Sequence, residues 1–200
     1  MKAALACVFV FSLAASARAE HVRLPALPDN VKVDADQVVF LVGHAAGTQN
    51  YICLPTATGV AYALFTPEAT LFTERGRQLT THFFSPNPDE HGTIRATWQH
   101  SRDTSAVWAR LAANGSSSDA SFVEAGAIPW LKLEKVGTQE GVGGSDTLTD
   151  TTFIQRINTR GGVAPATGCS GPADIGNKAF VPYQADYVFY RAPRSGQQPE

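Results

Sequence analysis

The stretch from Phe180 to Tyr190 reads FVPYQADYVFY and sets the expected fold. Apolar and aromatic residues occupy every second position from Val181 to Phe189, whereas polar Gln184 and Asp186 lie between them. Side chains alternate between two faces along an extended chain, so this period of two predicts a half-buried strand. Pro182 lacks a backbone donor and places the start of the strand at an edge or a bulge.

Short segments of the same kind recur upstream at intervals of roughly ten residues, which is typical of an antiparallel sandwich or barrel. Turn residues separate them, and 17 Gly and 12 Pro exclude a coiled coil or a long helical bundle. The expected strands are Gln37–Gly43, Asn50–Leu54, Gly59–Phe65, Ala69–Thr73, Leu79–Phe84, Thr93–His100, Ala106–Ala112 and Thr151–Asn158. The segment Ala127–Val136 fits neither a helix nor a strand cleanly.

These segments predict an all-β fold, an antiparallel β-sandwich or barrel in a single domain at 37–190. Residues 20–36 contain several breakers and are expected to form an extended lead-in, and 191–200 a disordered polar tail. The polar segment 114–119 is expected to be a flexible connection. In the strand after the glycine-rich loop, we expect Phe153 and Ile157 to face inward and Arg156 to face outward.

The first 19 residues have the pattern of a secretory signal peptide. Lys2 precedes an apolar stretch at 3–15, and Ala17-Arg18-Ala19 fits a cleavage site after Ala19. The apolar stretch is short for a membrane span, and no apolar run of membrane-spanning length follows it. We therefore expect a periplasmic or extracellular protein with no membrane span after the signal peptide is removed.

Two cysteines, Cys53 and Cys169, remain in that mature chain. An even count in an exported protein predicts one disulfide between them. A redox or nucleophilic cysteine is the alternative, but neither residue has a C-x-x-C partner. The net charge of −2 and the lack of a clustered basic stripe argue against a nucleic-acid partner.

Several stretches of the chain resemble a known secreted family. They are Gln49–Cys53 (QNYIC), Ala127–Glu134 (AIPWLKLE), Ile154–Pro165 (IQRINTRGGVAP) with Cys169, and Val181–Tyr190 (VPYQADYVFY). Together they resemble the family called domain of unknown function 3455. The resemblance implies an exported, mostly β protein of bacterial or fungal type, and it implies no agreed activity.

Motifs of common enzyme classes are missing from the sequence. Gly141-Val-Gly-Gly144 lacks the third glycine, the flanking strand and helix, and the acidic residue that dinucleotide binding requires. The serine in Gly168-Cys-Ser-Gly-Pro172 lacks the flanking residues of a nucleophile elbow. We therefore expect no cofactor and favour a non-catalytic module.

One cluster of side chains has the chemistry of a metal site. His82, His91 and His100 recur every nine residues, with Asp89 and Glu90 between them, and imidazole and carboxylate groups suit zinc or copper. In a hairpin turning near 88, His82 is expected opposite residues 95–96 and His100 near position 78. The alternative function is therefore a metal-binding protein or metal-dependent enzyme, and the competing interpretation is that these are surface and turn histidines.

A second group of residues has the chemistry of a ligand site. Arg156 and Arg160 flank a Gly161-Gly162 turn, and guanidinium groups beside backbone N–H groups hold carboxylate or phosphate. The competing interpretation is that the glycines supply positive φ for a tight turn. With Trp130 as an aromatic anchor, Arg156 and Arg160 form the predicted binding residues for a small anionic or saccharide ligand. The preferred function is thus an exported, non-catalytic ligand-binding or surface-associated module.

Overall fold

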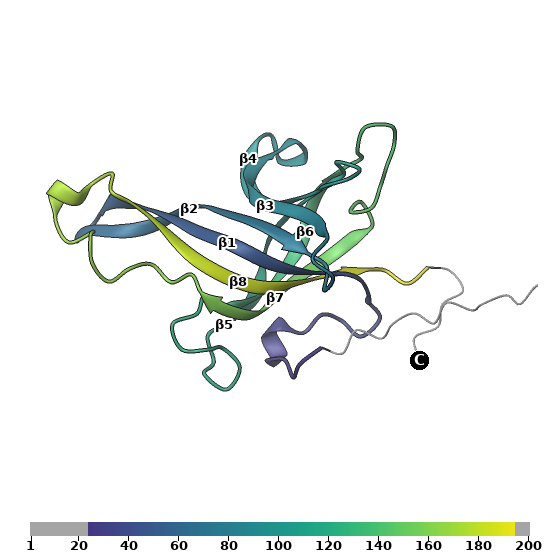
Figure 1. Ribbon diagram of the computed structural model, residues 1–200, viewed down its shortest axis with the longest axis horizontal. Coiled ribbons are helices and arrows are strands. Elements are labelled where there is room, and N and C mark those ends of the chain that lie inside the picture. The colour runs from purple at the N-terminus through teal and green to yellow at the C-terminus, as the bar shows by residue number, and fades with distance from the viewer. Residues whose placement is uncertain (1–23, 195–200) are drawn as a thin grey trace, which may run out of the picture.

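The computed structural model describes residues 24–194, and these form an eight-stranded antiparallel barrel (Figure 1). Each strand pairs with the next along the chain, and the last strand pairs with the first. The strands are β1 (Val38–Thr56), β2 (Gly59–Phe72), β3 (Gln78–Asn87), β4 (Thr93–His100), β5 (Ala106–Ser117), β6 (Trp130–Gln139), β7 (Thr151–Gly161) and β8 (Lys178–Arg191). Three 3-10 turns accompany them, η1 (Asp29–Val31), η2 (Pro88–Glu90) and η3 (Pro172–Asp174).

The seam between β1 and β8 closes the sheet. It pairs residues from Val38 opposite Arg191 to Ile52 opposite Lys178. The predicted all-β fold in one domain is confirmed, and of the two predicted architectures the chain adopts the barrel. Closure leaves no strand edge along the barrel wall, which removes the usual site of edge-to-edge aggregation.

Two of the strands are longer than the sequence pattern predicts. The segments expected at 37–43 and 50–54 belong to one strand, β1, and those at 59–65 and 69–73 belong to β2. At Gly47 strand β1 lies tightly against β2, since a Cβ there would stand 2.0 Å from the Glu68 carbonyl oxygen. Small residues in the middle of β1 predict an interruption of the strand. In the structure they allow a continuous strand to lie tightly against its neighbour.

Strand β5 also exceeds its expected length. It continues to Ser117 through the polar segment predicted to be flexible, with a register shift between Leu111 and Ser116. The ambiguous segment at 127–136 forms strand structure from Trp130 onward, pairing with β5 and β7. Pairing on both sides decides the conformation that local periodicity leaves open.

The apolar residues form two cores. The first fills the barrel interior and includes Trp98, Ile154, Tyr187 and Phe189. The second lies on the other face of β7 and β8, where Ile157 and Val188 are covered by the N-terminal segment and by the chain around Phe122. Phe153 and Ile157 belong to this second core, and the lead-in is held there by η1, whose Val31 is fully buried.

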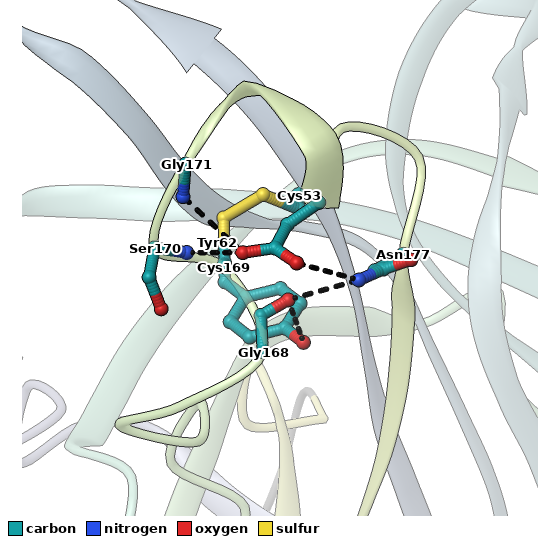
Figure 2. The surroundings of a disulfide bond; sticks show 8 residues. Cys53, Tyr62, Gly168, Cys169, Ser170, Gly171 and Asn177 are labelled. Atoms are coloured by element: carbon teal, nitrogen blue, oxygen red, sulfur yellow. Dashed lines mark hydrogen bonds between the residues drawn. A yellow bond between two sulfur atoms is a disulfide. The ribbon is translucent and has the colours of Figure 1, made fainter.

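Strands β1, β2 and β8 extend beyond the other five as a ribbon, on the left in Figure 1. The predicted disulfide between Cys53 and Cys169 is confirmed and ties this ribbon to the loop between β7 and β8, with a Cα–Cα distance of 5.5 Å. Tyr62 donates to the Gly168 carbonyl at 3.1 Å beside it (Figure 2). In the same loop the Asp174 carboxylate accepts from the Ser170 N–H at 2.7 Å.

The predicted signal peptide at 1–19 and the end of the predicted tail, 195–200, lie outside the described residues. Between 24 and 194 no helix is long and apolar enough to cross a membrane.

Candidate functional site

The barrel interior is not completely filled, and it leaves a cavity of about 410 Å³, which we call the lumen cavity. All eight strands contribute to its lining. The lining residues are Gln49, Tyr51, Leu64, Pro67, His82, Phe84, Ile94, Arg95, Ala96, Trp98, Ala109, Arg110, Leu111, Ile128, Pro129, Leu131, Leu133, Arg156 and Tyr187. Most are apolar, and a few polar groups converge among them, which is the usual composition of a small-molecule site.

The opening of the lumen cavity is bordered by exposed apolar side chains. Leu64, Ile94 and Leu111 are 39%, 55% and 50% exposed while also lining the cavity. Large aliphatic side chains usually lose such exposure on folding, and their gathering at one opening is a feature of binding surfaces.

Arg156 points into the lumen cavity. On β7 it lies opposite Leu131 of β6 and Tyr187 of β8, both of which line the cavity too. Its Nε and Nη2 groups donate to the Pro129 carbonyl oxygen at 3.2 and 2.9 Å. The expectation that Arg156 faces outward is therefore wrong. The apolar residues taken as inward in this strand pack on the outside of the barrel, beneath the N-terminal segment.

The other two arginines of the lining are already paired with carboxylates. Arg95 contacts Glu90 at 2.7 Å, and Arg110 contacts Glu134 at 2.6 Å. Hydrogen bonds from Arg95 and Asn87 lower the pKa of Glu90 to about 2, so its charge persists at ordinary pH. Within 24–194 no carboxylate pairs with Arg156.

His82 lies at the inner end of the lumen cavity, stacked on Trp98 with ring centroids 4.2 Å apart. Burial lowers its pKa to about 3, and the Arg156 charge acts in the same direction, so the ring is neutral at physiological pH. Its Nδ1 lies 2.9 Å from the Thr97 carbonyl oxygen, which only accepts. Nδ1 therefore carries the proton, and Nε2 is an acceptor.

Two further polar residues complete this inner end. Burial raises the pKa of Tyr187, against the effect of the nearby Arg156 charge, and its hydroxyl lies 3.2 Å from that of Tyr183. Gln49 is 2% exposed, and its Nε2 is buried without a hydrogen-bond partner. A buried amide donor without a partner is uncommon because its desolvation is uncompensated. Gln49 thus brings an amide donor to the cavity wall, close to the Tyr183 hydroxyl, whose pKa it lowers.

Arg160 and Trp130 line a different cavity, of about 600 Å³, which we call the outer cavity. There His44 Nδ1 lies 2.7 Å from Asp186 Oδ1, and the Asn158 amide donates to Asp186 Oδ2 at 2.7 Å. Trp130 is 4% exposed, and its Nε1 is buried without a partner.

Arg156 and Arg160 face opposite sides of the barrel wall although they are four residues apart. Asn158 between them has a left-handed φ of 50°, and the pairing of β7 with β8 shifts register between Ile157 and Arg160. Arg156 consequently pairs with Tyr187 on the inner face, and Arg160 with Gln184. Such a bulge reverses the alternation of side chains. The structure does not bring the two predicted anchors together.

The three predicted metal ligands also lie apart. His82 faces the lumen, His91 follows η2 in a left-handed conformation with φ 55°, and His100 Nδ1 contacts Asp103 at 2.9 Å at the far end of β4. Asp89 lies in η2. Across 24–194 no group of three or more His, Cys, Asp or Glu side chains is arranged to hold a metal ion.

The hairpin register explains part of this separation. His82 lies opposite Trp98, two to three residues further than expected, and His100 lies opposite Thr80 rather than position 78. The connection at 88–92 is shorter than the expected loop, because β3 continues to Asn87 before η2, and the centre of the hairpin lies further along the chain than position 88.

Sequence reasoning missed the polar side chains that accompany Arg156, above all Gln49 and Tyr187, as well as the His44–Asp186 pair. Gln49 stands in a run without an alternating pattern, so its inward orientation follows only from pairing with β2 and β8. Tyr187 was placed on the buried face of its strand, but its proximity to an arginine depends on the register of β7 against β8.

Residues 34–191 match the sequence profile of the family described as "Protein of unknown function (DUF3455)". No curated protein matches the chain. No solved structure matches it. Because the match covers most of the sequence and extends over all eight strands, the chain belongs to the DUF3455 family.

Proposed function

We propose that this protein is a non-catalytic binding module that holds a small, largely apolar molecule in the lumen cavity. The observation that carries the proposal is the cavity itself, about 410 Å³ with mainly apolar walls inside a barrel whose remaining interior is filled by large side chains. An eight-stranded barrel has room either for its own side chains or for one small ligand.

The chemistry of the lining supports binding rather than catalysis. The residues that line the lumen cavity include no serine, threonine, cysteine or carboxylate. Its histidine has a pKa of about 3, and burial raises the pKa of both its tyrosines, Tyr51 and Tyr187, so none of the three is poised to exchange a proton near neutral pH.

The test is binding of a neutral, environment-sensitive dye such as N-phenyl-1-naphthylamine, followed by fluorescence. An Ala96→Trp variant fills the cavity, because Ala96 lies on its wall opposite Phe84 and Ala109. Wild type is expected to bind the dye in a saturable way, and the variant to lose at least tenfold in affinity. Ala61→Trp, at an exposed position on the ribbon, is the matched control and should bind normally. Equal binding by all three proteins would reject the proposal.

The outer cavity supports a second candidate, a saccharide or anion site using Arg160 and Trp130. Planar polar side chains gather there beside Phe72 and Phe122, and the Trp130 Nε1 donor is unused. The alternative that the protein binds zinc or copper stays a prediction, and elemental analysis of the purified protein tests it.

A periplasmic or extracellular location is supported by the disulfide, since such bonds persist in oxidising compartments.

A further inference from the structure

We infer that the ligand of the lumen cavity is an amphipathic monocarboxylate, whose carboxylate pairs with Arg156 and whose apolar body extends toward the opening. This inference rests on the proposed function and specifies its ligand class. It depends on three features of Arg156, namely its charge, its free donors and its position in the cavity.

The first feature is an unbalanced positive charge. Arg156 is partly buried in a mainly apolar cavity, and no carboxylate pairs with it between residues 24 and 194. A buried charge is costly unless it is paired. Arg95 and Arg110 show the usual solution in the same cavity, because each has its own glutamate. The pairing that Arg156 lacks is therefore available to an anionic ligand.

The second feature is the set of donors that Arg156 keeps free. The guanidinium group has five N–H bonds in one plane. Nε and Nη2 are used along one edge, both toward the Pro129 carbonyl. Arg156 also contacts the Tyr187 hydroxyl, whose pKa it lowers. The edge formed by Nη1 and the second N–H of Nη2 has no hydrogen bond to a carbonyl or carboxylate within 24–194, and its two parallel donors match the two oxygens of a carboxylate. The bond to Pro129 also fixes the plane of the group.

The charge count favours a monoanion. Since Glu90 and Glu134 neutralise Arg95 and Arg110, Arg156 contributes the only unpaired cation among the lining residues. A doubly charged phosphate would leave one negative charge without a partner. Gln49 brings an amide donor that suits a second hydrogen bond to a carboxylate, whereas the neutral His82 presents only its Nε2 acceptor and donates none.

The third feature is the position of Arg156 relative to the cavity walls. It lies beside His82 and Tyr187. Its charge lowers the pKa of His82, as burial does, and it lowers the pKa of Tyr187, which burial raises. The exposed side chains of Leu64, Ile94 and Leu111 border the opening. A molecule with its charged end at Arg156 therefore places its apolar body against aliphatic walls and rim, and burial of that apolar surface contributes to binding.

The experiment measures displacement of the neutral dye by decanoate, decanol and decyl phosphate, with wild type, Arg156→Gln and Arg75→Gln. Arg75 is an exposed arginine in the turn between β2 and β3 and serves as the matched control. We expect decanoate to compete at least tenfold better than decanol or decyl phosphate in wild type and in Arg75→Gln. In Arg156→Gln the decanoate affinity should fall at least tenfold, with decanol unchanged.

The retained decanol affinity shows that Arg156→Gln is folded, so a loss confined to the carboxylate supports the inference. Arg156→Lys keeps the charge but not the paired donors and should bind decanoate with intermediate affinity. If decanol equals decanoate, if decyl phosphate binds best, or if Arg156→Gln binds decanoate normally, the inference is overturned while lumen binding stands. If wild type binds neither the dye nor any of the three compounds, the proposed function itself fails.

Discussion

His82 is the histidine whose surroundings differ most from water. It is fully buried, stacked on Trp98, and its pKa is lowered to about 3 by burial, with a backbone hydrogen bond acting the other way. In the unfolded chain its pKa returns to the ordinary value of 6.5. Between these values only the unfolded state binds the proton, so acidification favours unfolding.

We therefore expect the free energy of unfolding to decrease as the pH falls below 6.5. The contribution of His82 at pH 4.5 is on the order of 2–3 kcal/mol relative to neutral pH. Urea denaturation at a series of pH values measures it. His82→Asn keeps a donor toward the Thr97 carbonyl but does not titrate, so its stability should vary less between pH 7 and 5. Identical pH profiles for the two proteins would contradict this account of His82.

The orientation of Arg156 shows which information about a single residue the sequence does not contain. Strict alternation from Phe153 predicts which residues of β7 share a face, and that grouping is correct. What alternation omits is that both faces of β7 are covered, one by the barrel interior and one by the N-terminal segment. The apolar pair packs on the outside, which leaves Arg156 in the lumen.

At the scale of the strand, Gly47 sets how closely β1 and β2 approach. An added Cβ would lie 2.0 Å from the Glu68 carbonyl oxygen and 2.5 Å from the Ala69 Cα, so backbone must shift to accept it. We expect Gly47→Ala to lower the free energy of unfolding by about 2 kcal/mol or more.

Thermal or urea denaturation of Gly47→Ala tests this, with Gly171→Ala as the control. Gly171 has an extended φ of −158° and no atom near a built Cβ, so its replacement should change stability little. Equal stability of both variants would show that β1 and β2 separate without cost.

Strand prediction succeeds best where alternation is long. β8 has Tyr183, Tyr187 and Phe189 on one buried face as expected, because that face meets the barrel interior. Its other face is also buried near the end of the strand, where Val188 and Tyr190 belong to the second core. β1 and β2 were divided because small residues and proline interrupt their patterns. Those interruptions reflect close strand approach and the bulge between Asn50 and Tyr51, which depend on partners distant in sequence.

At the scale of the whole molecule, the disulfide connects the ribbon to the loop before β8 across 116 residues of sequence. Closing a loop of that size restricts the unfolded chain. The double variant Cys53→Ser, Cys169→Ser is expected to lose about 2–5 kcal/mol of stability.

Denaturation of the double variant and of reduced wild type should give the same shift. We also expect faster proteolysis within 163–177, because hydrogen bonds such as that between Tyr62 and Gly168 then hold this loop alone (Figure 2). Unchanged stability in both proteins would contradict the expectation that the disulfide stabilises the fold by restricting the unfolded chain.

The global architecture was predicted only to the level of sandwich or barrel. Local patterns indicate strands and turns, and short turns indicate antiparallel neighbours, but whether the first strand meets the last depends on twist accumulated around the whole sheet. The lumen cavity is equally invisible in the sequence, since it is the space left by side chains from eight separate strands.

The seam between β1 and β8 also governs the order in which this chain matures. β1 pairs on one side with β2, its neighbour in sequence, and on the other with β8, the last strand to be synthesised, so its second edge waits for a partner that arrives last. During that interval the open sheet exposes both that edge and its apolar inner face, which is when strands pair wrongly with other chains. We therefore expect the incomplete barrel, before its final strand is added, to be the state of this chain most prone to aggregate.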